Sequence, residues 1–125
     1  MTKRLAPVQL KADGRFWLTL DGRNFLGRGR VELLQRIRET GSISKAAKAM
    51  KMSYKAAWDA VDAMNTAWKS PLVESGPAGS YLTADAEQMI TAYQQAEARH
   101  AAFMDTLSTT LRPPHDKPRA QGRVL

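Results

Sequence analysis

The side chains best suited to bind a ligand are concentrated in one short stretch near the middle of the chain. From residue 41 it reads GSISKAAKAMKMSYKAAWDA. Lysine ammonium groups neutralise phosphates, hydroxyl groups donate hydrogen bonds to them, and aromatic rings supply apolar contacts to bases. These residue types therefore suit a polyanionic partner. The candidates are Ser42, Ser44, Lys45, Lys48, Ser53, Tyr54, Lys55 and Trp58.

Two short helices must position these side chains. Ser42 or Ser44 can cap a first helix that runs through Met50, and the pair Lys51-Met52 predicts a tight turn. Small residues line this helix at the point where a neighbour would cross it.

The second helix is predicted over 53–68, with Ser53 as its cap. Apolar side chains recur on it at helical spacing and predict a buried stripe, which consists of Ala57, Val61, Met64 and Trp68. Two short helices joined by a tight turn indicate a helix-turn-helix.

In a helix-turn-helix the second helix enters the major groove, led by its N-terminal residues. We therefore expect Tyr54, Lys55 and Trp58 to approach bases and phosphates. Lys45 and Lys48 of the first helix would reach flanking phosphates, and Ser42 and Ser44 would offer hydroxyl or backbone N–H groups.

Structural interpretations compete with each of these roles. Ser53 is first of all a helix cap, Tyr54 and Lys55 could be solvated surface, and Trp58 could pack against the apolar stripe. Asp59 and Asp62 could accept a hydrogen bond from a cytosine amino group, but solvated or intramolecular roles are favoured.

The flanking segments predict two β-hairpins. Residues 8–20 alternate in polarity around Asp13-Gly14, which indicates two short strands. A helix over 30–40 follows and ends at Gly41, a residue that suits the left-handed cap position. After Pro71, residues 72–74 and 81–82 predict a hairpin with its tip at 75–80, which is the position of a wing.

A long helix is predicted over 83–111, capped by Thr83. At 1.5 Å per residue it would be about 40 Å long, and its apolar seam exceeds what a domain of this size can cover. We therefore expect the seam to pair with a second copy. The predicted dimerisation residues are Met89, Tyr93, Ala96, His100, Phe103 and Leu107.

The sequence thus predicts a mainly α fold with small β elements: a winged helix-turn-helix with a short N-terminal β-hairpin and a long C-terminal dimerisation helix. Residues 1–82 would form the N-terminal strands and the DNA-binding domain, 83–111 the dimerisation helix, and 112–125 a disordered basic tail.

The distribution of charge favours the same partner. The net charge is +7 over 125 residues. Residues 31–70 hold seven basic and four acidic side chains, a net charge of +3, whereas residues 71–111 hold one and five, a net charge of −4. The helix-turn-helix segment is therefore the part that attracts a polyanion.

Composition argues against several other classes. The chain has no cysteine, and its two histidines, His100 and His115, are too scattered for a typical zinc site, so we expect no metal and no cofactor. Apolar runs are too short for a membrane helix and no signal peptide is recognisable, so we expect a cytoplasmic protein. Nucleophile-elbow, phosphate-loop and HExxH motifs are missing, and we expect no enzyme.

The helix-turn-helix stretch resembles the DNA-binding domain of the ModE family of molybdate-responsive transcriptional regulators, and more distantly the LysR-type regulators. The resemblance covers roughly 28–110 and is carried by these residues: Gly41-Ser42-Ile43-Ser44, Ala46-Ala47, the run SYKAAWDA from Ser53 to Ala60, Met64-Asn65, Leu72-Val73-Glu74 and Leu82-Thr83. It implies a winged helix-turn-helix dimer that pairs through its long C-terminal helix and binds a two-fold operator in double-stranded DNA. In ModE, oxyanion-binding domains that sense molybdate follow this part. The chain printed above ends at Leu125, so molybdate binding is not expected in it.

We therefore expect a sequence-specific, homodimeric transcriptional regulator. Two alternatives remain. One is a protein-interaction or assembly module on a helix-turn-helix scaffold, which is motivated by Asp59, Asp62 and a wing at 75–81 without a basic residue. The other is a non-specific, nucleoid-type DNA binder.

Overall fold

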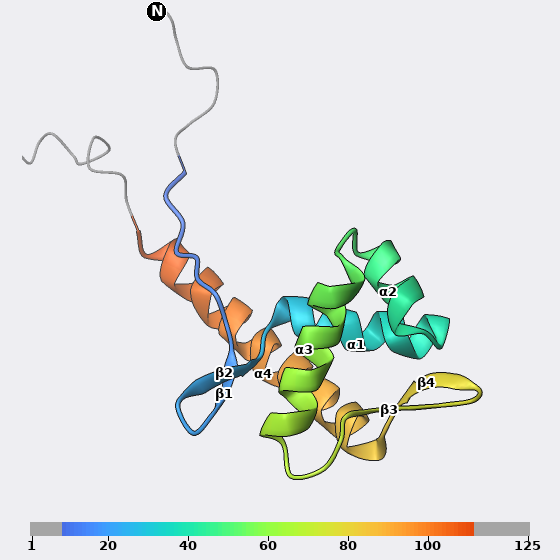
Figure 1. The fold of residues 1–125 in the computed structure, drawn as a ribbon. Coiled ribbons are helices and arrows are strands. Elements are labelled where there is room, and N and C mark those ends of the chain that lie inside the picture. Colours follow the sequence, from blue (N-terminus) through green and yellow to red (C-terminus); the bar gives the residue numbers. More distant parts are fainter. Residues whose placement is uncertain (1–8, 112–125) are drawn as a thin grey trace, which may run out of the picture. The chain divides into compact units, whose positions relative to one another are not determined.

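The computed structural model describes residues 9–111, and Figure 1 shows its helices and strands. The predicted disordered tail at 112–125 lies outside these residues. The elements are β1 (Leu18–Leu20), β2 (Arg23–Leu26), α1 (Arg28–Thr40), α2 (Ile43–Ala49), α3 (Tyr54–Ala67), β3 (Val73–Gly76), β4 (Gly79–Leu82) and α4 (Ala84–Thr109). Both sheets are two-stranded and antiparallel. The predicted fold class, mainly helical with a winged helix-turn-helix, is confirmed.

The chain forms two compact units. The larger comprises Phe16–Glu97 and contains every element except the last turns of α4. The described part of the smaller unit consists of residues 9–15 and 98–111. Within that unit, the Ser108 hydroxyl oxygen accepts a hydrogen bond from the Ala12 N–H at 2.8 Å.

The first hairpin lies later in the chain than the sequence predicted. β1 and β2 turn at Asp21-Gly22, where both residues have positive φ (50° and 81°), and not at Asp13-Gly14. The prediction of two strands within 8–20 was therefore wrong: residues 9–17 form no strand, and the Asp13 carboxylate accepts from the Gly14 N–H. Both Asp-Gly pairs carry the same turn signal. The hairpin turns at Asp21-Gly22 because this position places Phe25 and Leu26 in the core, at 2% and 0% exposure.

Helix α1 forms the centre of the larger unit. Its apolar face (Val31, Leu33, Leu34 and Ile37) is buried. The helix ends where predicted: Gly41 adopts the left-handed conformation at φ 70°, and its N–H donates to the Ile37 carbonyl. Only a residue without Cβ adopts this geometry readily.

Serine caps fix the two helices of the helix-turn-helix. The Ser42 hydroxyl accepts from the Lys45 N–H at 3.1 Å, and the Ser53 hydroxyl accepts from the Ala56 N–H at 3.0 Å. Such caps typically stabilise a helix by about 1 kcal/mol. Between the helices Lys51 has φ 56°, which reverses the chain in the predicted tight turn.

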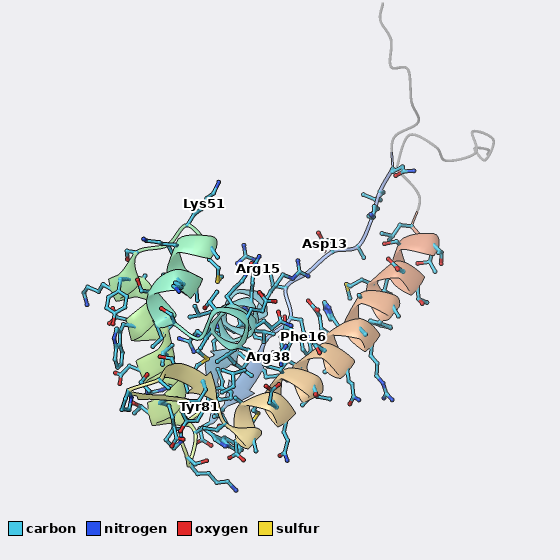
Figure 2. The ribbon with its side chains drawn as sticks, turned by 90° about the vertical axis from the view of Figure 1, so that its right-hand side faces the viewer. Asp13, Arg15, Phe16, Arg38, Lys51 and Tyr81 are labelled. Carbon is cyan, nitrogen blue, oxygen red and sulfur yellow. The ribbon has the colours of Figure 1, made fainter. Side chains whose placement is uncertain are left out.

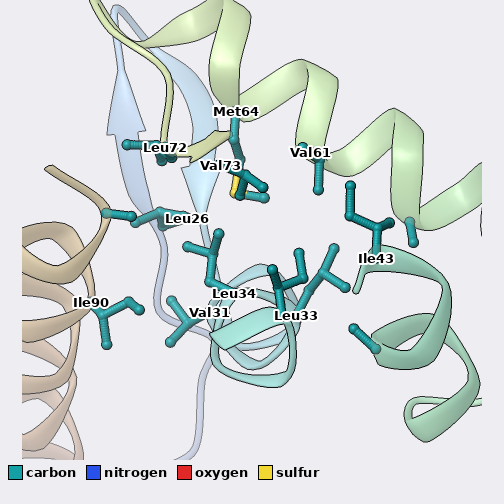
Figure 3. Packing of buried hydrophobic residues seen from close by; sticks show 14 of the residues in the cluster. Leu26, Val31, Leu33, Leu34, Ile43, Val61, Met64, Leu72, Val73 and Ile90 are labelled. Carbon is teal, nitrogen blue, oxygen red and sulfur yellow. The ribbon is translucent and has the colours of Figure 1, made fainter. Parts of the chain in front are cut away.

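The core lies between α1, α3, the wing and the start of α4 (Figure 3). Leu34 and Met64 are fully buried, as is Leu72 just before β3, and Ile90 closes the core from α4 at 3% exposure. Full burial of one such side chain stabilises the fold by about 1.5–3 kcal/mol.

The wing is held at both ends. The Asn65 side-chain oxygen accepts from the N–H groups of Leu72 and Val73, and its amide nitrogen donates to the Val73 carbonyl. The Ser80 N–H donates to the Gly41 carbonyl at 2.9 Å. The strands extend further than predicted, because the serines and glycines assigned to the tip pair with each other and leave two residues at the turn.

Helix α4 begins at a polar junction with α3. The Thr83 hydroxyl accepts from the Ala86 N–H, so the predicted cap is confirmed, and the helix begins at Ala84. The Asp85 carboxylate accepts from the Trp68 indole N–H at 2.8 Å and from the Ser70 hydroxyl at 2.7 Å. These two hydrogen bonds hold the pKa of Asp85 below its usual value. The predicted end at residue 111 exceeds the observed end at Thr109 by two residues.

Candidate nucleic-acid interface

Helix α3 has two faces of different character. Ala57, Val61 and Met64 are 0–2% exposed and bind the helix to the core. Tyr54 and Trp58 lie one turn apart and are 53% and 43% exposed. The predicted stripe is confirmed for its three buried members, and its fourth, Trp68, lies just after the helix and is half-buried against Phe25. Trp58 is not held in the core, so its ring is accessible to a partner.

Lys55 and Asp59 form an ion pair on the exposed part of α3. The Lys55 Nζ lies 3.1 Å from one Asp59 carboxylate oxygen, with side-chain exposures of 85% and 66%. The predicted intramolecular role of Asp59 is confirmed. Because both groups are well solvated, the pair contributes little to stability and can exchange partners readily.

Lysines continue the basic surface across α2. Lys45 and Lys48 are exposed, as the sequence suggested for phosphate ligands. Figure 2 shows Lys51 projecting from the turn between α2 and α3, where it is also exposed. Sequence reasoning had assigned Lys51 only to the turn. The signal was available, since the lysine at 51 continues the spacing of 45, 48 and 55.

The serines occupy structural positions beside this surface. Ser42 is half-buried, and its hydroxyl oxygen caps α2 by accepting a hydrogen bond from the Lys45 N–H. Ser44 is exposed in the first turn of that helix. Ser53 is exposed while its hydroxyl caps α3. The N–H groups of these first turns lack intrahelical carbonyl partners and point out of the helix ends, where they can meet an anion.

The wing brings no positive charge to the surface. Residues 73–82 contain no lysine or arginine. Tyr81 is 56% exposed, and its hydroxyl donates to the Glu74 carboxylate at 3.1 Å, a hydrogen bond that raises the pKa of the phenol. The wing therefore offers hydroxyl and aromatic contacts together with one carboxylate.

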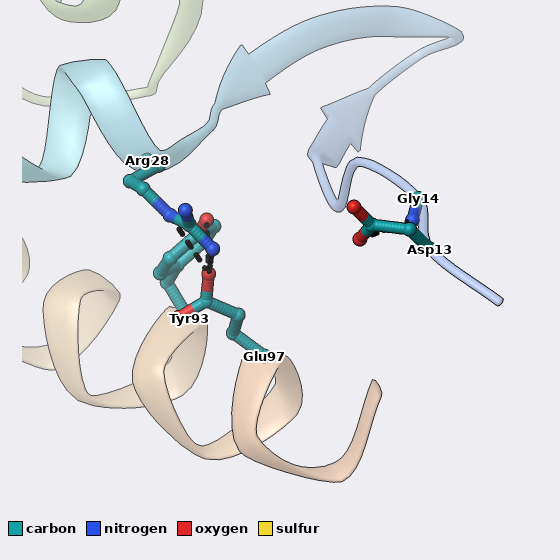
Figure 4. A network of polar contacts seen from close by, with 5 residues as sticks. All are labelled: Asp13, Gly14, Arg28, Tyr93 and Glu97. Carbon is teal, nitrogen blue, oxygen red and sulfur yellow. Dashed lines mark hydrogen bonds and ion pairs between the residues drawn. The ribbon is translucent and has the colours of Figure 1, made fainter. Parts of the chain in front are cut away.

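Some of the predicted dimerisation residues in the larger unit pack into the core of their own chain. Tyr93 is 2% exposed, and its ring lies 5.5 Å from that of Phe16. Burial raises the pKa of Tyr93, and its hydroxyl donates to Glu97, which also binds Arg28 (Figure 4). Met89 is half-buried against the core and Ala96 is half-buried as well.

The remaining predicted dimerisation residues belong to the smaller unit. Phe103 is 57% exposed and Leu107 is 37% exposed. His100 is half-buried, and its ring lies 3.9 Å from where a Cβ on Gly14 would stand. Phe103 and Leu107 therefore leave an apolar strip on this part of α4.

A groove of about 420 Å³ lies between α1 and α4 in the larger unit. Ion pairs line its walls: within α1, Arg36 lies 3.5 Å from both Glu32 and Glu39, and Arg28 of α1 contacts Glu97 of α4 across the groove. Neighbouring opposite charges cancel, so the groove has no strong field for either sign of ligand.

Residues 9–111 offer neither a membrane-spanning helix nor a metal-binding cluster. Among these residues no helix is long and apolar enough to cross a membrane. The same described part of the chain contains no cluster of three or more side chains that could hold a metal ion.

The fold and its exposed helix define a winged helix-turn-helix domain. Residues 29–87 match the family model described as bacterial regulatory helix-turn-helix protein, lysR family. Residues 29–87 are therefore similar to the helix-turn-helix domain of the lysR family, as the sequence resemblance predicted.

Two known proteins that the chain matches agree with its resemblance to ModE. The chain is 38% identical over 103 residues to the transcriptional regulator ModE of Yersinia pestis, a match covering 78% of this chain and 39% of that protein. It is 42% identical over 91 residues to the molybdenum-pterin-binding protein MopB of Rhodobacter capsulatus, covering 69% of this chain and 34% of that protein. The match thus spans little more than a third of either relative.

Solved structures agree on the fold. The LysR family transcriptional regulator CbnR superposes with a TM-score of 0.52 at 17% identity, covering 65% of this chain and 28% of that chain. The CbnR DNA-binding domain in its DNA complex gives the same TM-score and identity and covers 78% of this chain and 100% of that one.

Proposed function

We propose that this chain is a sequence-specific DNA-binding transcriptional regulator that acts as a homodimer in the cytoplasm. The observation that carries the proposal is the exposed start of α3, where Tyr54, Lys55 and Trp58 face away from the buried stripe. Support comes from relatives named as transcriptional regulators and from a similar fold solved in a DNA complex.

In this proposal α3 enters the major groove with its N-terminal turns. Tyr54 and Trp58 contact base edges, where an aromatic ring packs against a thymine methyl group. Lys55 neutralises a phosphate when it leaves its intrahelical partner. The exposed start of the helix supports this orientation.

The neighbouring helix α2 anchors the backbone of the duplex. Lys45 and Lys48 neutralise phosphates, and Lys51 adds a third positive charge at the turn. Ser42, Ser44 and Ser53 donate hydrogen bonds to phosphate oxygens from their hydroxyl groups or from first-turn N–H groups. These contacts would set the register of α3 without reading sequence.

The dimer is proposed to form through the last turns of α4. Phe103 and Leu107 of one copy would pack against Phe103 and Leu107 of the second copy, and His100 and Ala96 would lie beside them. Residues 83–111 would thus serve as the dimerisation helix and residues up to 82 as the DNA-binding domain. Met89 and Tyr93 also belong to the predicted seam, but their burial assigns them mainly to the core. A two-fold dimer places its two recognition helices about 34 Å apart.

The test is fluorescence anisotropy with two labelled duplexes of equal length at about 150 mM salt. One is the sequence most enriched by the protein from a random library, and the other is its scramble. The proposal expects the selected duplex to bind at least about a thousandfold more tightly than the scramble. Equal binding to both, lost on addition of salt, would instead indicate a non-specific binder.

A second candidate is a protein-interaction module on the same scaffold. The lack of positive charge on the wing favours it, since residues 73–82 contain one carboxylate and no basic side chain. This candidate expects no binding to either duplex, and it expects a partner protein to slow amide exchange in residues 53–62.

A further inference from the structure

The Lys55–Asp59 pair raises a question that the proposed function does not answer. A surface that binds phosphates gains from every positive charge, yet on this one a carboxylate is paired with Lys55. Asp59 is 66% exposed and lies one turn after Lys55, on the same side of α3. Its carboxylate holds the lysine ammonium at 3.1 and 3.4 Å.

Two effects of this carboxylate weaken general DNA binding. It repels phosphate oxygens and the acceptor atoms of base edges. It also occupies the Lys55 ammonium, which would otherwise neutralise a phosphate. Non-specific affinity is therefore lower than the lysines alone would give.

The same carboxylate can favour one particular base. In the major groove the cytosine N4 amino group is a hydrogen-bond donor, and an aspartate oxygen is its matching acceptor. When Asp59 accepts from that group, the carboxylate is satisfied and Lys55 is released to a neighbouring phosphate. Exchange of partners is easy, because both side chains are solvated and their pairing is weak.

We propose that Asp59 is a specificity-determining residue that requires a cytosine in each half-site and releases Lys55 only when it finds one. This inference rests on the proposed DNA-binding function. It differs from a purely structural role of the ion pair, because it predicts a particular base and a change in salt dependence.

Asp62 supplies the matched control. It is an exposed aspartate on the same helix, and among the described residues it forms no ion pair. It lies two turns beyond Tyr54, further from the end of the helix that leads into the groove. Asp59→Ala and Asp62→Ala change the net charge equally and replace an exposed residue with a good helix former.

The experiment selects duplexes from a random library with the wild type and both variants. The wild type is expected to enrich sites with one invariant cytosine in each half. D59A is expected to lose the preference at that position alone, and D62A to keep it. Selection of the same cytosine by D59A would overturn the inference while leaving the proposed function intact, whereas a wild type that binds no duplex would overturn both.

Anisotropy provides an independent readout. On a scrambled duplex at about 150 mM salt, D59A is expected to bind about fivefold more tightly, because Lys55 gains a phosphate. The slope of log K against log salt should steepen by about 0.9, the value for one additional phosphate contact. The preference for the selected duplex over the scramble should fall about tenfold. D62A with the same slope and preference as D59A would contradict the special position of Asp59.

Discussion

Two regions of the molecule expose apolar side chains, and their surroundings differ. At the start of α3, Tyr54 and Trp58 are exposed on the same helix as Lys55, and the preceding helix α2 carries the exposed Lys45 and Lys48. In the last turns of α4, Phe103 and Leu107 lie in a segment that holds few charges, Arg99 and Asp105 among them. Large exposed apolar side chains in either place indicate a contact surface.

The difference lies in what each surface can attract. Aromatic rings and lysines on one surface suit a partner that has both negative charge and apolar groups, such as the phosphates and thymine methyl groups of duplex DNA. An apolar strip with little charge suits another strip of the same kind, and a second copy of the chain provides one. This difference supports the proposal that α3 binds DNA and that α4 pairs with a second copy.

The largest expected effect comes from placing charge on the strip of α4. Phe103→Asp with Leu107→Asp should remove about 3–6 kcal/mol of apolar burial, which weakens the dimer by between about a hundredfold and about ten-thousandfold. Analytical ultracentrifugation over a concentration series measures this change. Ala101→Asp, an exposed residue of the same helix, is the control and should leave the dimer intact. Equal dissociation by the control would contradict the assignment of the strip.

A smaller effect is expected at the aromatic end of α3. Trp58→Ala should lower the affinity for the selected duplex about thirtyfold, as expected when a contacting aromatic ring is truncated. Because Trp58 is 43% exposed, folding and dimerisation should change little. Thr66→Ala, at an exposed position further along the helix, is the control for anisotropy. A Trp58 variant with normal affinity and a lower melting temperature would instead place the ring in the core.

The wing tests whether the α3 surface depends on its neighbours. Gly79 has φ 115°, and a Cβ there would lie 2.5 Å from the Gly41 carbonyl oxygen. Gly79→Ala should therefore destabilise the fold by about 2 kcal/mol. Gly29, at the start of α1, has open space around a Cβ, so Gly29→Ala should be neutral or slightly stabilising. Urea denaturation distinguishes the two, and equal stabilities would exclude a close contact of the wing.

The smallest effect concerns the junction of α3 and α4 and depends on pH. The pKa of Asp85 is lowered by its hydrogen bonds with Trp68 and Ser70. A depressed native pKa stabilises the fold above the ordinary value of about 3.9 and loses this contribution as pH falls through the native pKa. Asp85→Asn should therefore melt at a lower temperature at pH 7 and approach the wild type in acid. A melting difference that does not change with pH would contradict this role of the carboxylate.

Much of the helix-turn-helix could be predicted because its signals are local. The capping serines at 42 and 53, the left-handed Gly41 and Pro71 each act within a few residues. The helices accordingly begin and end within about two residues of the prediction. The buried stripe of α3 followed from its 3.6-residue period.

The parts that could not be predicted depend on distant contacts. The sequence placed the hairpin turn at Asp13-Gly14, whereas the strands turn at Asp21-Gly22, where the hairpin buries Phe25 and Leu26. Periodicity identified the seam of α4 but could not separate residues that face their own core from residues that face outward. Tyr93 is buried on Phe16, 77 residues earlier in the chain, and nothing near Tyr93 in the sequence reveals that contact.

The candidate DNA-binding residues could be proposed from their residue types, but the sequence did not show which of them are exposed or which contact one another. Exposure of Tyr54 and Trp58 became clear only once the core was known. The Lys55–Asp59 pair was one of several pairings that the spacing allowed. The structure reduces these alternatives by showing which side chains remain solvated in the single chain.

Amide hydrogen exchange with and without the selected duplex tests the two assignments together. The Ser53 hydroxyl caps the Ala56 N–H, but the N–H groups of Tyr54 and Lys55 lack intrahelical carbonyl partners, so they exchange quickly unless a ligand covers them. Added duplex is expected to slow exchange in residues 53–62 and to leave residues 98–109 unchanged. Slower exchange in 98–109 with no change in 53–62 would contradict the assignment of DNA to α3.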